Sequence, residues 1–279
     1  MSNNKVWYVT GASQGLGLSL VKQLLSAGYR VAATSRTATG LQKAVGTTLE
    51  NQFLPLGVDL TSAEAIRHSI EQTVATFGTI DVIVNNAGYG MEGTIEELEE
   101  EKLRAIFEIN VLATINVTKY ALPYLRKQRS GHIINISSVA GFVGAPGWSI
   151  YSATKSAVIA FSEVLALDVE GLGIKVTVVG PSGFRTGFLS KESLVSVESR
   201  IADYQSVTRT HERYAAMNGA QDGDPEKAAA LFIRLAENPE PPLHLWLGTN
   251  AFHRASEKIE SMGEEIKKWK DLSLSADFK

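Results

Sequence analysis

Cysteine is absent from the 279 residues of the sequence, and so is any long uninterrupted run of apolar residues. The first absence excludes disulfides, thiolate zinc sites, iron-sulfur clusters and a cysteine nucleophile. The second argues against a membrane-spanning helix, because Gly, Lys, Arg or Asp breaks every apolar run before about 18 residues. Any chemistry must therefore come from oxygen and nitrogen groups.

A surplus of charge of one sign is also missing. The 27 basic and 30 acidic residues leave a formal net charge of -3 at pH 7, which indicates neither a nucleic-acid nor an acidic-membrane partner. Hydrophobic residues make up 44% of the chain and charged residues 20%, proportions typical of globular proteins. The first residues contain neither a basic leader nor a long apolar segment, so we expect a cytoplasmic protein.

Short β-branched segments alternate with amphipathic ones along the chain, a pattern that predicts an α/β fold with a parallel sheet between helices. Seven strands are predicted, at residues 6–10, 30–35, 53–58, 82–85, 132–137, 175–179 and 243–247. Helices are predicted at residues 15–27, 62–77, 96–129 with an internal break, 151–170 and 225–237, the last capped by Asp224. No linker divides the chain, so we expect one domain over residues 1–279.

Two segments fall outside this alternation. Residues 184–222 form an insertion much longer than the usual connection of about 2 to 6 residues, and we expect it to be a substrate lid. Residues 248–279 follow the last predicted strand as a C-terminal extension. Its Glu- and Lys-rich part, residues 251–270, predicts a solvent-exposed amphipathic helix.

A glycine-rich segment, residues 10–17, stands directly after the first strand and before the first helix. Its glycines at 11, 15 and 17 let the backbone turn sharply and approach a pyrophosphate, and the helix that follows presents unpaired amides to it. The first two glycines are four residues apart rather than two, so the usual G-x-G-x-x-G pattern does not apply. The segment predicts an anion-binding loop.

The same segment also contains a nucleophile-elbow pattern, G-x-S-x-G, at residues 11–15. In a serine hydrolase Ser13 would be the nucleophile, with Asp224 and His244 following in the correct order. Only ten residues precede the motif, which leaves no room for an upstream oxyanion loop. We therefore favour the dinucleotide interpretation.

Ser35 and Arg36 end the second predicted strand, about twenty residues after the glycines, where a dinucleotide site recognises the adenosine ribose. A carboxylate there would accept hydrogen bonds from a free 2'-hydroxyl and repel a 2'-phosphate. Arg36 instead offers a planar cationic fork to a phosphate. The sequence therefore favours NADP over NAD.

Three further motifs follow predicted strands, at the edge where an open parallel sheet binds its ligand: residues 85–88, 137–138 and 151–155. Tyr151 and Lys155 are four residues apart, so they share one face of a helix. The ammonium favours the phenolate, and we expect it to bring the pKa of Tyr151 toward neutrality for acid–base work.

In this order and spacing the motifs resemble those of the short-chain dehydrogenase/reductase family. The match covers nearly the whole chain, from residue 6 to residue 247. The family's glycine motif stands at residues 10–17, its N-N-A-G at 85–88 and its Y-x-x-x-K at 151–155, with Asp59, Asn110 and Ser138 at the family's other positions. Ser138 rather than Ser137 matches, because it lies 13 residues before Tyr151. Pro181-Ser182-Gly183 departs from the family's Pro-Gly, although Thr186 remains available for the cofactor.

The resemblance implies a Rossmann-type, doubly wound sheet ordered 3-2-1-4-5-6-7 and hydride exchange between NADP(H) and a carbonyl or alcohol. Ser138, Tyr151, Lys155 and Asn110 would be catalytic, with Asn110 holding a water beside Lys155, and no metal is needed. By the same resemblance the cofactor would be held by Gly11, Ser13, Gln14, Gly15, Leu16, Gly17, Ser35, Arg36, Asp59, Leu60, Asn86, Ala87, Gly88, Tyr151, Lys155, Pro181, Gly183 and Thr186. Family members associate through the helices here at 111–129 and 151–170, so we expect a homo-oligomer.

The substrate pocket is expected to be apolar and aromatic. Candidate lining residues are Tyr89, Met91, Phe142, Val143, Trp148, Phe184, Phe188, Leu189, Tyr204 and Tyr214. Such a lining predicts a hydrophobic small-molecule ketone or aldehyde, and the chain is weakly similar to family branches that act on steroids and retinoids. A 3-oxoacyl-carrier-protein reductase and a catalytically silent NADP-sensing module remain as alternatives.

Overall fold

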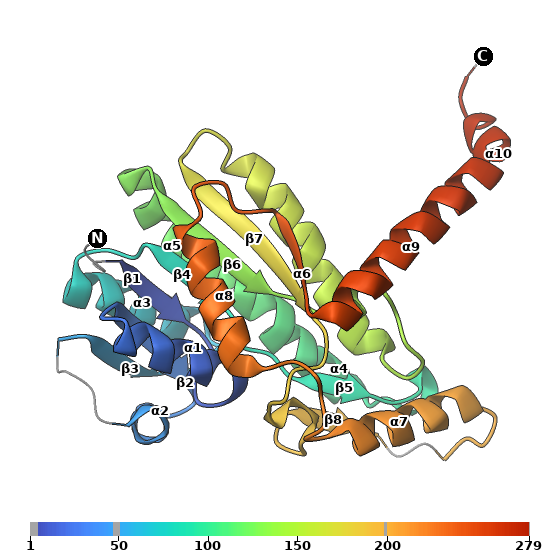
Figure 1. Cartoon of the computed structure of the whole chain (residues 1–279), viewed down its shortest axis with the longest axis horizontal. Coiled ribbons are helices and arrows are strands. Elements are labelled where there is room, and N and C mark those ends of the chain that lie inside the picture. Colours follow the sequence, from blue (N-terminus) through green and yellow to red (C-terminus); the bar gives the residue numbers. More distant parts are fainter. Residues whose placement is uncertain (1–4, 47–50, 198–199, 279) are drawn as a thin grey trace.

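The computed structural model describes residues 5–46, 51–197 and 200–278, and its centre is a parallel sheet of seven strands (Figure 1). The strands are β1 (Val6–Val9), β2 (Arg30–Ser35), β3 (Phe53–Gly57), β4 (Val82–Asn85), β6 (Gly131–Ile136), β7 (Ile174–Pro181) and β9 (His244–Leu247). Their order, β3-β2-β1-β4-β6-β7-β9, confirms the predicted topology.

Helices cover both faces of the sheet because its strands are apolar on both sides. Trp7 and Val9 in β1 point to one face and Tyr8 to the other, as the two-residue period of a strand requires, and all three are buried. One face carries α1 (Gly15–Ser26) and α8 (Pro225–Glu237); the other carries α3 (Ala63–Phe77), α5 (Ala113–Gln128) and α6 (Ser149–Asp168). The Asp224 carboxylate accepts the Glu226 amide at 2.9 Å, which confirms the predicted cap of α8.

The long helix predicted at residues 96–129 is divided into several parts. It consists of a 3-10 turn (Ile95–Glu97), α4 (Glu100–Phe107), a π-helical turn (Glu108–Leu112) and α5. Asn110 lies in the π-helical turn, a feature that often accompanies functional sites. A short helix, α2 (Ala38–Val45), was not predicted, because its eight residues are fewer than the roughly 11 to 18 over which a helical period can be recognised.

The insertion at 184–222 contains structure of its own. A 3-10 turn (Gly187–Leu189) precedes β8 (Leu194–Ser196), which pairs with β5 (Gly90–Glu92) in a separate two-stranded sheet, and α7 (Gln205–Met217) follows. After β9 the chain forms α9 (Thr249–Lys268) and α10 (Lys270–Leu274). Figure 1 shows α7 and β8 beside the sheet's C-terminal edge, and α9 leading away from the body.

Among the described helices, α6 alone is long and apolar enough to cross a membrane by length and composition. Its apolar side chains have another explanation, since Val158, Ile159 and Leu165 pack in the core against the sheet. The same helix positions Tyr151 and Lys155 within its first two turns.

Candidate active site

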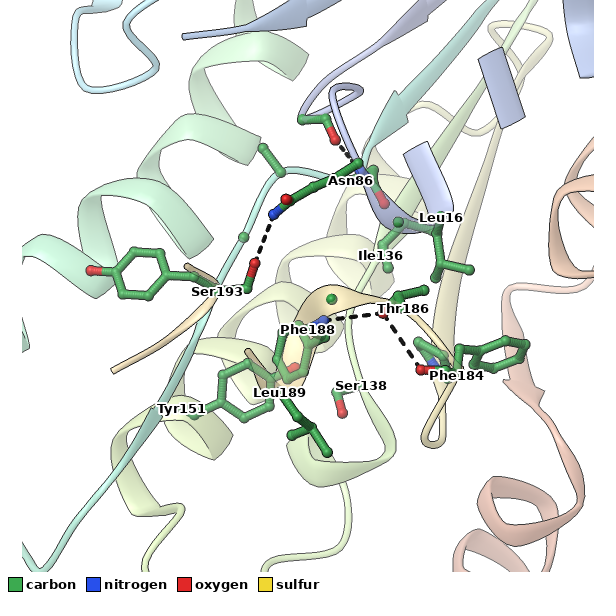
Figure 2. Close-up of a pocket in the computed structure, with 18 of the residues that line it drawn as sticks. Leu16, Asn86, Ile136, Ser138, Tyr151, Phe184, Thr186, Phe188, Leu189 and Ser193 are labelled. Atoms are coloured by element: carbon green, nitrogen blue, oxygen red, sulfur yellow. Dashed lines mark hydrogen bonds between the residues drawn. The ribbon is translucent and has the colours of Figure 1, made fainter. Parts of the chain in front are cut away.

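A cavity of about 650 Å³ opens at the C-terminal ends of the strands, where the glycine-rich loop, the ends of β2, β4 and β6 and the start of α6 meet the insertion at residues 184–222, named the lid segment after its predicted role. Figure 2 shows Tyr151, Ser138, Phe188 and Leu189 near one another in this cavity, with Leu16 and Asn86 farther along it. Of the residues predicted to hold a cofactor, all but Gly17 line the cavity.

The glycine-rich loop has the shape that a pyrophosphate requires. Gly11 has φ +65°, and a Cβ there would lie 2.7 Å from the Cα of Ala87; Gly15 has φ +57°. Gly17 is buried behind the loop, where a Cβ would come within 2.6 Å of the side-chain nitrogen Nδ2 of Asn86. No side chain caps the start of α1, so its first amides remain available to an anion.

Hydrogen bonds lock the loop to its neighbour after β4. The Thr10 hydroxyl accepts the amides of Asn86 and Ala87, each at 3.0 Å, and the Asn86 side chain donates to Thr10 O at 2.9 Å. The Gln14 side chain donates to the Ser193 hydroxyl at 2.7 Å, which ties the loop to the lid segment as well. The loop is therefore held in its binding shape by the protein itself.

The opposite end of the cavity is polar and open to solvent. Arg36 is exposed, and within the part of the chain that the structure describes its guanidinium makes no hydrogen bond or ion pair. Ser35 donates to Thr37 O at 2.7 Å, and Asp59 accepts both the amide and the hydroxyl of Thr61. These Thr61 contacts lower the pKa of Asp59 below its ordinary value.

Tyr151 lies at the enclosed end, with only 5% of its surface exposed. Its ring meets Trp148 edge to face at 5.4 Å and Phe188 of the lid segment at 5.7 Å between centroids. This burial raises the pKa of Tyr151 above its ordinary value, and the nearby Ser138 hydroxyl acts in the opposite direction. The prediction that Lys155 brings the pKa of Tyr151 toward neutrality is wrong for the protein alone, because desolvation of the buried phenol dominates. The phenol is therefore protonated at neutral pH.

Lys155 is 4% exposed, and burial lowers its pKa to about 8. Its ammonium donates to Ile136 O at 3.0 Å and lies 5.8 Å from the centroid of the Tyr151 ring. Asn110 is buried nearby: its side chain accepts the Tyr89 amide and donates to Tyr89 O and to the Thr154 hydroxyl. Asn110 thus fixes the chain at Tyr89 and does not itself line the cavity.

The two neighbouring serines after β6 have different surroundings. The Ser137 hydroxyl donates to Lys155 O at 2.7 Å, whereas the Ser138 hydroxyl accepts the Ala140 amide and keeps its own proton available on the Tyr151 side. Beyond them, Pro181, Gly183 and Thr186 line the cavity. The Thr186 hydroxyl accepts the Phe188 amide at 3.3 Å and so shapes the start of the lid segment (Figure 2).

Six of the ten expected substrate-pocket residues line the cavity: Tyr89, Trp148, Phe184, Phe188, Leu189 and Tyr214. The other four do not contribute to the lining. Met91 is buried beneath the pocket, Phe142 and Val143 stand behind it, where Phe142 stacks on Trp246, and Tyr204 is held at the surface by Glu96.

Sequence reasoning missed several lining residues, including Met217, Gln221, Asn250 and Arg254. The last two belong to the first turns of α9, which the sequence predicted only as a solvated helix. No local motif marks them, because their place beside the cavity depends on β9 ending next to β7.

The serine-hydrolase arrangement is not formed. The Asp224 carboxylate caps α8, and His244 pairs with Glu163 at 2.8 Å at the N-terminal end of β9. Ser13 instead follows the C-terminal end of β1, and β4, β6 and β7 lie between β1 and β9 in the parallel sheet. Over the described residues, no group of three or more His, Asp or Glu side chains is arranged to hold a metal ion.

Known proteins are similar to this chain in sequence. The sequence profile described as short chain dehydrogenase matches residues 5–194. Oxidoreductase BOA17 of Botryotinia fuckeliana is 35% identical over 273 residues, which cover 98% of this chain and 99% of that protein. The 3-ketodihydrosphingosine reductase of Bacteroides thetaiotaomicron is 33% identical over 240 residues, 86% of either chain.

Solved structures agree with these relatives. A short-chain dehydrogenase from Streptomyces avermitilis has a TM-score of 0.90 at 35% identity, covering 98% of this chain and 99% of that one. ElxO with bound NADP has a TM-score of 0.71 at 26% identity, covering 86% and 95%. A Burkholderia phymatum enzyme in complex with NAD, at 20% identity, TM-score 0.75 and coverage of 88% and 90%, shares the fold. The chain belongs to the short-chain dehydrogenase/reductase family of oxidoreductases.

Proposed function

We propose that this protein reduces a hydrophobic ketone or aldehyde with NADPH. The observation that carries the proposal is the contrast inside one cavity: a protonated, buried Tyr151 beside Ser138 at an apolar end, and an exposed, unpaired Arg36 at the other. The glycine loop, in which a Cβ at position 11 would collide with Ala87, fits a bound pyrophosphate between them. When bound, the nicotinamide supplies the hydride.

In the proposed reaction the chain's own residues handle the substrate oxygen and its proton. Ser138 donates a hydrogen bond to the carbonyl oxygen, and Tyr151 gives the phenolic proton to that oxygen as negative charge develops. The charged Lys155 stabilises the phenolate that remains, and it would also bind the ribose hydroxyls of the cofactor. Asn110 is a positioning residue, because its side chain holds Tyr89 and Thr154 around Lys155.

The preference for NADP rests on the end of β2. Arg36 has no partner among the residues that the structure describes, so its guanidinium is available to a 2'-phosphate, and Ser35 offers no carboxylate to repel one. The relative ElxO, which binds NADP, is consistent with this preference.

The hydrophobic nature of the substrate rests on the walls around Tyr151, which Trp148, Phe188 and Tyr214 build. The similarity to a 3-ketodihydrosphingosine reductase supports a long-chain ketone in particular. A 3-oxoacyl-carrier-protein reductase would in addition need a basic rim for an acidic carrier. The charged lining residues beyond Lys155 are Arg36, Asp59, Glu192 and Arg254, a mixed set that does not favour such a partner.

Steady-state assays test this function. NADPH consumption is measured with a panel of aliphatic and aromatic ketones and aldehydes of increasing chain length, and with acyl-carrier-bound 3-oxoacyl substrates. We expect kcat/KM to rise with apolar length and to exceed the value for the carrier-bound substrates. Tight NADPH binding without turnover of any carbonyl would leave the silent module as the correct description. Hydrolysis of an ester that Ser13→Ala abolishes would contradict the oxidoreductase mechanism.

We also propose that the protein is a homo-oligomer. The helices by which the family usually associates are α5 and α6, and the outer side of α6 exposes Val164 and Leu167. Light scattering at micromolar concentration tests this proposal, and a purely monomeric mass would contradict it.

A further inference from the structure

Among the described residues, the first two turns of helix α9 carry its buried contacts with the rest of the protein. Ala251 and Ala255 are buried against the body, and Arg254 donates to Val143 O at 2.9 Å. From residue 257 to 278 every residue except Gly263 is exposed. Figure 1 shows α9 running away from the sheet, with α10 and the C-terminus at its far end.

The projecting part of α9 nevertheless has an apolar stripe. Ile259, Met262, Ile266 and Trp269 form the α9 seam, and between 40% and 69% of each residue is exposed. Their spacing of three, four and three residues places them on one face of the helix, in the a and d pattern of a coiled coil. Phe252, seven residues before Ile259 and 60% exposed, continues the stripe toward the body.

Such a helix needs a partner. The part of α9 that projects beyond the anchored turns, residues 257–268, is short enough to be marginal in water when nothing packs against it, and Gly263 in its middle weakens it further. None of the four seam residues belongs to a core cluster of the described chain. The opposite face is charged, which fits a helix with one solvated side and one covered side.

We propose that the α9 seam pairs with the α9 seam of a second copy of this chain, with the two helices antiparallel. The seam continues the face on which Ala251 and Ala255 already touch the body. In a parallel pair, the first two turns of the partner's α9 would lie where the globular part of this copy already is, so the two copies would collide. In an antiparallel pair, the C-terminal end of the partner's helix lies there instead, and no globular part is attached to that end.

Charge also favours the antiparallel arrangement. From residue 257 to 265 four glutamates (257, 260, 264 and 265) outnumber one lysine, Lys258, and from residue 267 to 271 three lysines (267, 268 and 270) outnumber one aspartate, Asp271. Antiparallel helices place the basic end of one copy alongside the acidic stretch of the other. Parallel helices would place lysines beside lysines, which is unfavourable.

The register follows when the two-fold axis crosses the helix pair at the level of Glu264. Ile259 then lies opposite Trp269 of the second copy, and Met262 lies opposite Ile266 of the second copy. Gly263 comes next to the axis, where it has open space around it and lets the two backbones approach closely. The pairing covers all four seam residues of both copies.

A membrane surface is the competing occupant, because the seam contains Trp and Ile and the helix ends in lysines. The helix and α10 carry five acidic and five basic side chains from residue 249 to 274, so they have no net attraction for anionic lipid. The acidic and basic side chains are separated along the helix axis, and this separation stabilises an antiparallel pair but does not strengthen binding to a membrane surface.

Spin-label distance measurements test the pairing directly, since the chain has no cysteine and one engineered cysteine gives one label. Labels are attached to Glu264→Cys and, separately, to Glu257→Cys, which lie on the same outward face. We expect the 264 labels to be within about 30 Å of each other. The 257 labels should be farther apart, because 14 residues of helix separate them along the axis, about 21 Å. Equal distances at both sites would overturn the antiparallel orientation.

Seam variants complete the test. Ile266→Glu should remove the short 264 distance and raise the dissociation constant of the pair about a hundredfold or more, measured by sedimentation. Ser261→Glu, which adds the same charge on the outward face, should change neither. A helical circular dichroism signal and retained NADPH binding verify that both variants are folded. Absence of a short distance in the otherwise unchanged chain overturns the proposal, and so does its survival in Ile266→Glu. Seam-dependent binding to phosphatidylserine vesicles without a short distance would assign the seam to a membrane.

Discussion

The two ends of the cavity differ in how much of the site the protein fixes in advance. At the Tyr151 end the functional side chains are at least nine-tenths buried, and hydrogen bonds from the backbone or from Asn110 surround them. At the Arg36 end the guanidinium is exposed and has no partner among the described residues. The first end is prepared for proton transfer, and the second for attracting an anion from solvent.

The difference follows from what each task requires. Proton transfer depends on atoms held within hydrogen-bond reach and on pKa values that burial sets, as the raised pKa of Tyr151 and the lowered pKa of Lys155 illustrate. Recognition of a phosphate by a planar cation tolerates a flexible side chain, because charge and hydrogen bonds form together on contact. Changes at the two ends should therefore affect different measured quantities.

The largest effect is expected from Tyr151→Phe, which removes the phenolic proton and leaves the ring packed against Trp148 and Phe188. General acid catalysis contributes roughly 100- to 10,000-fold, so kcat for carbonyl reduction should fall by that range while NADPH affinity is unchanged. Stopped-flow turnover and NADPH fluorescence titration measure the two quantities.

Tyr89→Phe is the matched control, because Tyr89 lines the same cavity and its hydroxyl makes no hydrogen bond within the described residues. We expect its turnover to stay close to that of the unchanged enzyme. If Tyr151→Phe kept more than a tenth of the original rate, Tyr151 would not be the acid.

The next effect concerns cofactor affinity at the exposed end. Arg36→Ala should weaken NADPH binding roughly 10- to 150-fold, because a hydrogen bond to a charged group contributes about 1.5 to 3 kcal/mol. NADH lacks the phosphate and should bind almost as before. Adding Ser35→Asp should then reverse the preference, since the carboxylate repels the phosphate and accepts the ribose hydroxyl. Isothermal titration with both cofactors measures these changes.

Lys43→Ala controls for a general loss of positive charge, because Lys43 is exposed on the adjacent α2 and does not line the cavity. It should leave both affinities unchanged. Equal weakening of NADPH and NADH by Arg36→Ala would return Arg36 to an ordinary surface residue.

A third effect is expected in the pH profile. Burial lowers the pKa of Lys155 to about 8, so its ammonium is charged below that pH and loses its proton above it. The value of kcat/KM for NADPH-dependent reduction should therefore be level below pH 8 and fall up to about tenfold per pH unit above it. Tyr151 stays protonated throughout, because burial raises its pKa. A profile that remained level to pH 9.5 would show that the charge on Lys155 is not required.

The smallest effect is expected away from both ends. Asp224→Ala removes the carboxylate that accepts the Glu226 amide at the start of α8, and loss of such a cap costs about 1 kcal/mol. The melting temperature should fall by about 2 to 4 °C, with kcat unchanged. Asp222→Ala, an exposed neighbour without a hydrogen bond in the described chain, should leave the melting temperature unaltered. A drop in kcat for Asp224→Ala would mean that α8 is coupled to the site.

Much of the fold and of the cavity could be predicted because the signals are local. The glycine-rich loop, Ser35-Arg36 and Tyr151 each directly precede or follow a regular element, and parallel strands bring all such ends to one edge. That residues 184–222 are an insertion was also visible from their length. The strand β8 and helix α7 inside it were not, since β8 exists only by pairing with β5, about a hundred residues earlier in the chain.

The sequence by itself determined the strand order, through the family resemblance that its motif spacings carry, and the predicted cofactor-binding residues, of which all but Gly17 line the cavity. Only the tertiary structure decided which aromatic side chains face the cavity, as Met91 and Phe142 turn into packed clusters instead. It also decided the direction in which the pKa of Tyr151 shifts, because the burial that raises it comes from packing with distant segments such as the one that carries Phe188. The same holds for α9, whose first turns reach the cavity and whose seam is left uncovered, since packing depends on contacts between distant segments.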